Sequence, residues 1–403
     1  MRTEGAVEGV AGLTAPTFLE FFCGGGMARV GLGEAWACRF ANDFDAMKVA
    51  TYAANWGAEH IREADVATLT PDDLPRGRAD LAWASFPCQD LSLAGGYRGL
   101  GREHDNAPTR SGTFWSFWRL MRALAAQQRA PRAIVLENVY GALTSHRGQD
   151  FVAIADALAG AGYRFGAMVI NAAQFVPQSR PRVFFVALAQ GEAIDAAPLA
   201  EHPNAAWSPP ALRRAHACLS EETKKSWVWW SPQPPARRIL DFADVIEDQP
   251  TGVDWHPAPA TARLLSLMSE VNRHKVKAAQ KAGQRKVGTV YRRTRPDENG
   301  QKRQRAEVRF DEVFGCLRTP AGGSSRQIIL VVEGKKIRSR LVSPREAARL
   351  MGLADDYRLP PRYNDAYHVC GDGVCAPVVR FLAETILEPI LSHRARQKSI
   401  AAE

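Results

Sequence analysis

Residues 17–36 read TFLEFFCGGGMARVGLGEAW and decide the fold of the first half of the chain. The apolar run 17–22 predicts a buried strand, the glycines after Cys23 a tight turn, and the pattern from Met27 onward a helix. Further strands are predicted at 38–43, 80–86, 133–139 and 182–188, and helices at 111–128 and 150–162. Strands that alternate with helices are typical of a parallel, doubly wound sheet, so we expect an α/β domain.

This alternation ends near residue 190. The following segments HPNAAWSPPALRR (202–214) and WVWWSPQPPARR (227–238) are rich in Pro and Trp. Regular helices return at 343–353, where Ser343 and Glu346 have the spacing of a capping box, and at 376–391. The expected domains are 1–190 for catalysis and cofactor binding, 191–335 for a smaller irregular domain, and 336–403 for a segment that returns to the first.

Composition restricts the class of protein. The chain has 403 residues, of which 46% are hydrophobic, as in a globular protein with a large core. No apolar run approaches the length of a membrane span and the first residues do not resemble a secretory signal, so a cytoplasmic location is expected. The seven cysteines form no CxxC pair, which disfavours a disulfide framework or a zinc site, and no metal is expected.

The net charge of +9 is unevenly distributed. A basic run between residues 273 and 309 is opposed by Asp297, Glu298 and Glu307 alone. Its members are Arg273, Lys275, Lys277, Lys281, Arg285, Lys286, Arg292, Arg293, Arg295, Lys302, Arg303, Arg305 and Arg309. Such a run is either a solvated surface or a face that contacts nucleic-acid phosphates.

The glycine turn after the first strand carries the signature of a nucleoside site. Glycines there allow a ligand to approach the backbone, and the following helix offers N–H groups. Asp43 follows about 20 residues later at a strand end, where an acid can bind ribose hydroxyls. Phe44 can stack on an adenine ring, and Asp65 can accept from its amino group. NAD and S-adenosylmethionine are both candidates on this pattern.

A second set of reactive side chains is expected at the same edge of the sheet. It comprises Cys88, Glu137, Asn138, Gln178, Arg180 and Arg182. A thiolate can add to C6 of a pyrimidine, a neutral carboxyl group can donate to N3, and an arginine can hold O2. Addition at C6 makes C5 nucleophilic enough to attack a methyl sulfonium, which favours S-adenosylmethionine over NAD.

Seven motifs together resemble those of DNA (cytosine-5)-methyltransferases. They are FFCGGGMARVGLG, ANDFD, SFPCQDLS, SGTFW, ENV, QSRPR and GDGV, in the order and spacing of that family. The resemblance covers roughly 17–190 and 340–391. It implies a Rossmann-like, S-adenosylmethionine-dependent domain, a variable target-recognition region, and a C-terminal helix that packs back on the first domain. It also implies methylation of a flipped-out cytosine in double-stranded DNA, typical of restriction–modification systems, with S-adenosylhomocysteine as product.

The resemblance also implies a role for each site residue. Cys88 is the nucleophile, Glu137 the N3 donor and Arg182 the O2 contact, with Arg180 and Gln178 in support. The residues expected to bind the cofactor are Phe22, Gly24, Gly26, Asp43, Phe44, Asp65, Pro87, Thr113, Phe114, Asp372 and Val374. Those expected to contact DNA are Ala94, near the space left by the flipped base, and Arg318, Arg326 and Gln327, which can read base edges.

The chain departs from the family pattern at three places. Asp43 stands where Glu is common, Met27 replaces a frequent second Gly, and GDGV stands where Asn-Ser is frequent. Met27 lies at the glycine turn, Asp43 at the end of the next predicted strand, and GDGV near the C-terminus. None affects the thiol, carboxyl or arginine roles.

Two other functions remain open on the sequence. One is an RNA cytosine-5 methyltransferase of the tRNA-modifying branch, and the other is a catalytically silent DNA-binding regulator. An amino-methylating DNA enzyme is disfavoured, because its Asp/Asn-Pro-Pro-aromatic motif is absent. The enzyme is expected to act as a monomer, associated with the nucleoid through DNA, and separately from any cognate restriction endonuclease.

Overall fold

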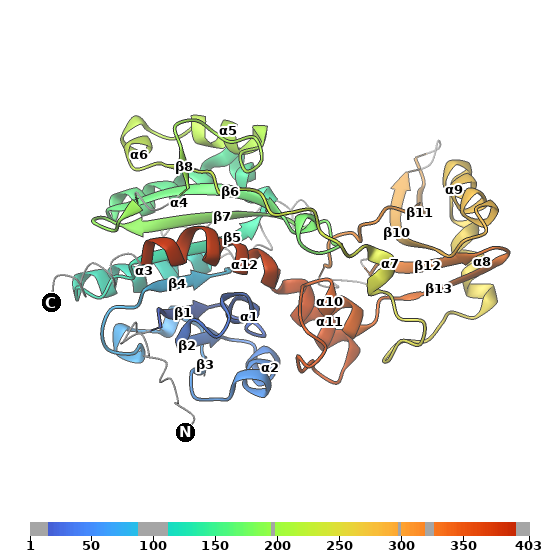
Figure 1. The fold of residues 1–403 in the computed structure, drawn as a ribbon, viewed down its shortest axis with the longest axis horizontal. Helices are drawn as coiled ribbons and strands as arrows, with labels where there is room; N and C mark the ends of the chain where they lie inside the picture. The colour runs from blue at the N-terminus through green and yellow to red at the C-terminus, as the bar shows by residue number, and fades with distance from the viewer. Residues whose placement is uncertain (1–14, 88–111, 195–197, 297–299, 319–325, 392–403) are drawn as a thin grey trace, which may run out of the picture.

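The protein has two lobes, each built on its own sheet. The computed structural model describes residues 15–87, 112–194, 198–296, 300–318 and 326–391. A seven-stranded sheet organises the larger lobe and a four-stranded sheet the smaller one (Figure 1). Within the described ranges, no helix is long and apolar enough to cross a membrane.

The large sheet has the order β3-β2-β1-β4-β5-β7-β6. Its strands are β1 (Thr17–Phe21), β2 (Ala37–Asp43), β3 (Ile61–Glu63), β4 (Leu81–Ala84), β5 (Ala133–Val139), β6 (Tyr163–Asn171) and β7 (Pro181–Ala189). Strands β1 to β5 pair in parallel, as predicted, but β7 is antiparallel to both β5 and β6. The connection from Asn171 to Pro181 is too short for a crossover helix, so β6 and β7 form a hairpin. The expectation of a fully parallel sheet is therefore wrong at this edge.

Helices cover both faces of the large sheet. Helices α3 (Thr113–Ala126) and α4 (Gln149–Gly160) pack on one face, and α1 (Met27–Leu32), α2 (Ala46–Trp56) and α12 (Ala376–Leu382) on the other. The α12 helix continues as the π-helical turn η8 (Ala383–Leu387). A Cβ on Gly31 of α1 would lie 2.4 Å from the Ala376 carbonyl oxygen, so glycine allows these two helices to touch. The C-terminal helix predicted at 376–391 thus packs on the large lobe.

The segment after β7 also packs on the large lobe. It contains β8 (Leu199–Ala200), α5 (Pro210–Ala217), α6 (Glu221–Lys225) and β9 (Trp229–Trp230). The N–H groups of Phe165 and Val169 in β6 donate to the carbonyl oxygens of Ser226 (2.9 Å) and Trp207 (2.8 Å). Residues 199–230 therefore cover an edge strand of the large sheet, whereas the sequence pattern placed them in the second domain.

The smaller lobe is a regular antiparallel sheet with the order β11-β10-β12-β13, where an irregular domain was expected. Its strands are β10 (Lys286–Pro296), β11 (Lys302–Arg309), β12 (Ile328–Glu333) and β13 (Lys336–Leu341). Helices α8 (Ala258–Ser266) and α9 (Glu270–Lys281) pack on one face. The short helix α7 (Phe242–Val245) packs on the opposite face, next to Phe314.

Helices α10 (Pro344–Arg349) and α11 (Tyr363–Asp372) lie between the two lobes (Figure 1). The predicted capping box at the start of α10 is confirmed. The Glu346 N–H donates to Ser343 Oγ (3.1 Å), and the Ser343 N–H donates to Glu346 Oε2 (2.8 Å). One continuous apolar core links these helices to β12 and to the large sheet.

Candidate active site

The turn after β1 leaves one glycine open to a ligand. Phe22 and Gly24 both have φ near 55°, which is easy for glycine and rare for phenylalanine. Among the described residues, no atom lies within 4 Å of the position that a Cβ on Gly24 would take, whereas a Cβ on Gly26 would lie 2.6 Å from Trp56 Nε1. Of these two predicted cofactor contacts, Gly24 has free space beside its α-carbon, whereas Gly26 is closely packed against Trp56 and Tyr52.

The carboxylate of Asp43 holds this turn in place. Asp43 ends β2, is 5% exposed, and accepts hydrogen bonds from the N–H groups of Gly24 (2.9 Å) and Asp45 (3.0 Å). Because each carboxylate oxygen has more than one lone pair, Asp43 can still accept from a ribose hydroxyl. The residue type fits the predicted role, and its contact to Gly24 adds a structural one.

Two exposed side chains, those of Phe44 and Asp65, lie at the same edge of the sheet as Asp43. Phe44 directly follows Asp43 and is 68% exposed, so its ring can stack on a base. Asp65 is exposed at the start of the 3₁₀ turn η1 (Val66–Thr68), where its Oδ1 accepts from the Ala67 N–H (2.9 Å). An exposed aromatic ring with two acids at the carboxyl edge of a sheet fits the adenosine part of S-adenosylmethionine.

The other predicted cofactor residues are less accessible. Phe114 is 0% exposed and packs on Phe86, with ring centroids 5.4 Å apart. Val374 is 4% exposed. Pro87 is half-buried after β4, and Thr113 begins α3. The ring of Phe114 therefore packs in the core next to the segment that leads to Pro87, and it has no exposed surface for a ligand.

Asp372 forms an ion pair that the sequence did not predict. Its carboxylate lies 2.8 Å from Nζ of Lys48, which joins α11 to α2. Burial lowers the pKa of Lys48, but the nearby carboxylates of Asp372 and Asp43 raise it more, so the net shift is upward. A lysine in the first turns of a helix has no sequence signature for this role.

Two of the departures from the family pattern, Met27 and the GDGV motif, lie in contact with each other. Met27 is buried (1% exposed) at the start of α1. A Cβ on Gly373, within the GDGV motif, would lie only 2.2 Å from Met27 Sδ. The larger residue in the glycine turn therefore fits because the residue it faces lacks a side chain.

Glu137 and Arg182 meet at the carboxyl edge of the sheet. Arg182 Nε lies 3.1 Å from Glu137 Oε1, and Glu137 is 6% exposed. The antiparallel direction of β7 makes this contact, because it puts Arg182 opposite Val139 at the end of β5. In a fully parallel sheet, a residue at the start of a strand would lie at the opposite edge. The structure thus brings these two predicted catalytic residues together by a topology that the sequence pattern did not show.

The side chains of Gln178 and Arg180 lie behind that pair. They are 0% and 2% exposed and form hydrogen bonds to other segments of the chain. Gln178 donates to the Leu350 carbonyl oxygen (2.7 Å) and accepts from the Leu317 N–H (3.0 Å). Arg180 donates to the carbonyl oxygens of Gly371 (2.8 Å) and Gly373 (2.7 Å). They tie this edge of the sheet to the segments around Leu317, Leu350 and Gly371, and their supporting role in catalysis stays a prediction.

Cys316 is a residue at this edge that sequence reasoning missed. Its Sγ lies 3.5 Å from Arg180 Nη1 and 3.9 Å from Arg182 Nη2. Burial raises the pKa of its thiol, but the positive charges of Arg180 and Arg182 lower it more, so the pKa lies below its ordinary value. The two arginines are far from Cys316 in sequence, so no local motif could have indicated this cluster.

A model of the C-5 cytosine-specific DNA methylase family matches residues 16–388. The chain belongs to this family. The Type II methyltransferase M.NlaX of Neisseria lactamica is 26% identical over 376 residues, covering 91% of this chain and 94% of that protein. M.HpaII of Haemophilus parainfluenzae is 24% identical over 391 residues, covering 93% and 90%. The crystal structure of S. pombe Dnmt2 methyltransferase shares the fold, with a TM-score of 0.56 at 18% identity over 93% of this chain and 99% of that one.

Membership of the methylase family confirms the predicted α/β class and implies S-adenosylmethionine as methyl donor. Two of the predicted site residues, Cys88 and Ala94, lie outside the described residues, as does most of the loop 318–327. Cys88 follows β4 by four positions in the sequence, and its role rests on the Pro-Cys-Gln motif.

The three predicted base-reading residues of this methylase differ in exposure. Arg318 is exposed. Arg326 donates to Asn364 Oδ1 and lies over the Tyr363 ring, 5.4 Å from its centroid. Gln327 is 4% exposed and donates to the Cys316 carbonyl oxygen (2.8 Å). Burial favours a structural role for Gln327 over the predicted base contact, whereas Arg318 keeps the access that base reading requires.

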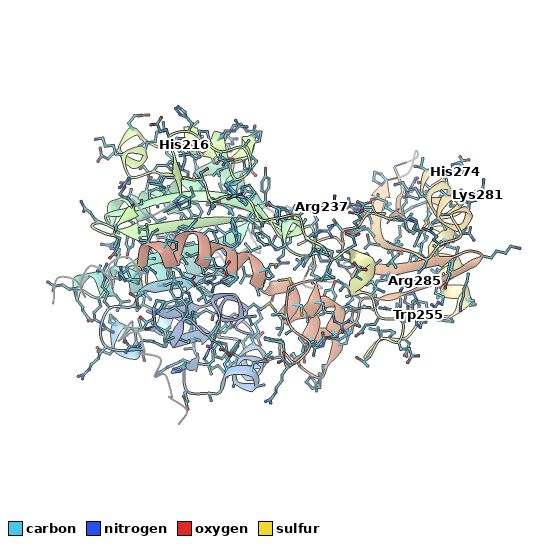
Figure 2. The ribbon with its side chains drawn as sticks, viewed as in Figure 1. His216, Arg237, Trp255, His274, Lys281 and Arg285 are labelled. Carbon is cyan, nitrogen blue, oxygen red and sulfur yellow. The ribbon has the colours of Figure 1, made fainter. Side chains whose placement is uncertain are left out.

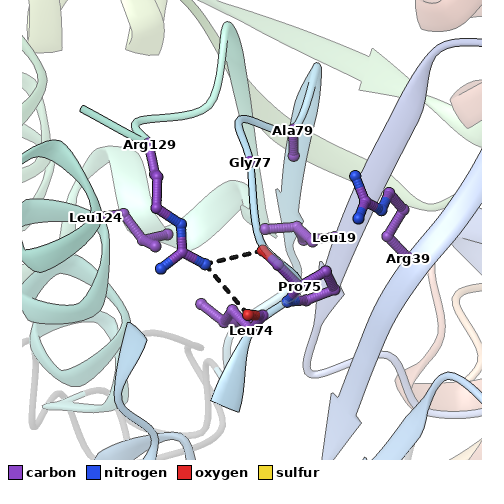
Figure 3. Close-up of a pocket in the computed structure, with 8 residues that line it drawn as sticks. All are labelled: Leu19, Arg39, Leu74, Pro75, Gly77, Ala79, Leu124 and Arg129. Atoms are coloured by element: carbon purple, nitrogen blue, oxygen red, sulfur yellow. Dashed lines mark hydrogen bonds between the residues drawn. The ribbon is translucent and has the colours of Figure 1, made fainter. Parts of the chain in front are cut away.

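A small pocket lies away from this edge, lined among others by Leu74, Pro75 and Arg129. Figure 3 shows it near the amino ends of the strands, where Arg129 donates to the carbonyl oxygens of Leu74 (3.1 Å) and Pro75 (2.8 Å). Its volume of about 10 Å³ has room for about one water molecule. Within the described ranges, no cluster of three His, Cys, Asp or Glu side chains is placed to hold a metal ion.

Proposed function

We propose that this protein transfers a methyl group from S-adenosylmethionine to C5 of a cytosine in a specific double-stranded DNA sequence. The observation that carries the proposal is the contact between Glu137 and Arg182 (3.1 Å) at the sheet edge that also bears the open turn at Gly24. A carboxyl group and a guanidinium group side by side match the adjacent N3 and O2 atoms of cytosine. The chain belongs to a family with this reaction.

The protein's task is to make C5 nucleophilic. Cys88 adds as a thiolate to C6, and the ring electrons move toward N3 and C5. Glu137 donates a proton to N3, and Arg182 stabilises the charge on O2, so each develops its strongest contact as the bond to Cys88 forms. Once C5 carries the methyl group, a base removes the C5 proton, the C6–sulfur bond breaks to release Cys88 as a thiolate, and Glu137 takes back the proton from N3.

The residues around Gly24 fit S-adenosylmethionine, which would supply the electrophilic methyl group. Gly24 leaves room at the backbone, Phe44 offers a ring face, and Asp43 and Asp65 offer acceptors for ribose and adenine. Buried Gln178 and Arg180 hold the segments around Cys316 and Gly373 against the catalytic edge. This rigidity would keep the reacting groups aligned.

The target cytosine must leave the duplex before it can reach Glu137. Flipping costs a few kcal/mol, and contacts between DNA phosphates and the basic smaller lobe would offset that cost. We propose that the enzyme acts as a monomer and separately from any cognate endonuclease.

Transfer of labelled methyl groups tests this function. Duplex DNA should take up label from S-adenosylmethionine, and bisulfite sequencing should place it at cytosines in one recurring sequence. Glu137→Gln should lower kcat by about 10²–10⁴-fold, because the amide cannot donate a proton to N3. S-adenosylmethionine affinity should be unchanged in that variant, since Glu137 lies outside the nucleoside site.

Three other outcomes would contradict the proposal. Label in tRNA and not in DNA would favour the RNA enzyme. Sequence-specific DNA binding without any transfer would favour a silent regulator. Full activity in Glu137→Gln would remove the carboxyl group from the mechanism.

A further inference from the structure

The basic run between residues 273 and 309 is divided by the small sheet into two groups. One group lies on the β10–β11 pair and the other on α9, with Arg285 in the connection between them. They are separated because α9 packs on one face of the ribbon, while alternate residues of each strand point to the other face.

The β10–β11 pair extends beyond the rest of the sheet. β10 pairs with β12 from Lys286 to Val290, but with β11 from Thr289 to Pro296. Among the residues that the structure describes, 291–296 and 302–307 therefore form a two-stranded ribbon with no third strand beside this part of β10. A ribbon of this kind has both faces available over its outer part.

One face of this ribbon is crowded with arginine. Arg293 stands directly opposite Arg305, and the next pair on the same face of the backbone is Arg295 opposite Arg303. Like charges directly opposite one another destabilise a strand pair. Glu307, 3.6 Å from Arg293, is a nearby carboxylate on this face. We call the exposed side chains of Arg293, Arg303 and Arg305 the arginine face.

The arginine face is continuous with the catalytic edge. Tyr291 precedes Arg293 on the same face, and the Arg293 guanidinium lies 5.6 Å from the centroid of its ring. A Cβ on Gly315 would lie 1.4 Å from Tyr291 Oη, so the tyrosine packs directly on the Gly315 backbone. The next residue, Cys316, contacts Arg180 and Arg182. A molecule bound at Glu137 can thus extend onto the arginine face.

The α9 cations lie on the opposite side of the sheet. Val290, Ala306 and Val308 on the other face of the ribbon pack with Val276 and Ala279 of α9. The exposed residues Arg273, Lys277 and Lys281 are on this helix. Figure 1 shows α9 on the side of β10 and β11 away from the large lobe, and Figure 2 shows Lys281 and His274 at that outer side.

We infer that the arginine face is where the duplex phosphates bind, and that the α9 cations make no contact with DNA. The inference rests on the proposed function, because it takes double-stranded DNA as the molecule held at the catalytic edge. The exposure of Arg293, Arg303 and Arg305, and the continuity of their face with the catalytic edge, fit a duplex held at that edge. The sequence alone left the whole run as either a solvated surface or a phosphate-contacting face, and the inference assigns the two roles to different parts of it.

Two triple variants with equal charge loss test this division. The arginine-face variant is Arg293→Gln, Arg303→Gln and Arg305→Gln, and the matched α9 variant is Arg273→Gln, Lys277→Gln and Lys281→Gln. Duplex affinity is measured by fluorescence anisotropy between about 50 and 200 mM salt, where each phosphate contact contributes about 0.9 to the slope of log K against log salt. The arginine-face variant should lose about 2 to 3 units of slope, and the α9 variant should keep the wild-type slope.

Equal slope changes in the two variants, or a change in the α9 variant alone, would overturn the inference. Such a result would leave the proposed function intact as long as the wild type still methylates DNA. A wild type that binds duplex DNA but transfers no methyl group would reject the proposed function, and the comparison of salt slopes would still be valid. Thermal unfolding and S-adenosylmethionine calorimetry check that both variants fold. If the triple arginine variant does not fold, Arg305→Gln alone should lower the slope by about 0.9.

Discussion

Met27 and Gly373 show how single residues of this chain depart from the family pattern without harming the site. Each departure is unexplained when taken alone in the sequence. Together they form one contact, in which a Cβ on Gly373 would come within 2.2 Å of Met27 Sδ. Sequence reasoning could note both positions but could not pair them, because their proximity depends on how α11 packs on α1.

This contact predicts a compensating pair of substitutions. Gly373→Ser should destabilise the protein by about 1–3 kcal/mol through overpacking, measured by urea unfolding. Met27→Gly removes the obstructing side chain, so the double variant should be more stable than the sum of the two single effects predicts. Strict additivity of the two changes would show that the side chains do not interact.

At the level of helices and strands, local signals in the sequence were reliable and long-range ones were not. The capping box of α10 was predicted from the spacing of Ser343 and Glu346 alone, and the structure confirms it. The start of α1 carries no such signal, because Gly26 offers no side chain. Glu20, on the preceding strand, is buried at 1% exposure, and the charge of Arg29 in α1 opposes the rise of its pKa. The direction of β7 is likewise not visible in its own sequence, because a strand's direction is set by the strands beside it.

Glu20 predicts a pH dependence of stability. Burial raises its pKa from 4.5 to about 8, with Arg29 opposing the shift. The folded state therefore holds this proton more tightly than the unfolded state, so stability falls as pH rises between these values. The loss between about pH 5 and pH 8 is on the order of 3–4 kcal/mol.

Urea unfolding at both pH values checks this. Glu20→Gln should flatten that part of the pH dependence and be the more stable protein at pH 8. Exposed Glu34→Gln serves as the matched control and should follow the wild type. Parallel pH curves for Glu20→Gln and the wild type would show that Glu20 does not titrate in this range.

For the whole molecule, the sequence predicted the order of the parts better than their packing. The α/β lobe, the break after β7 and the returning C-terminal helix were all visible as changes of pattern. The Pro and Trp residues in 199–230 obscure the periodicity of helices and strands, so the sequence alone predicts that this segment belongs to the second domain. In the structure, buried Trp207 and Trp230 pack this segment on the large lobe. The regular small sheet was missed because its basic ribbon has little apolar alternation.

The covalent bond between Cys88 and cytosine is the feature on which the proposed mechanism depends most. Fluorine at C5 cannot leave as a cation, so the C6–sulfur bond cannot break after methyl transfer. Duplex DNA with 5-fluorocytosine at the target should therefore trap the enzyme in an adduct that survives denaturing electrophoresis and accumulates only with S-adenosylmethionine. Cys88→Ser should abolish the adduct, because a hydroxyl group is far less ionised and less nucleophilic than a thiol.

Mass spectrometry of the trapped peptide is the most direct measurement. The cysteine that carries the base should be Cys88, and DNA binding should survive in Cys88→Ser because the smaller lobe is unchanged. Cys316 is the main alternative nucleophile, because Arg180 and Arg182 lower the pKa of its thiol at the same edge of the sheet. Attachment of the base at Cys316 or at any other cysteine, or full methylation by Cys88→Ser, would contradict the mechanism.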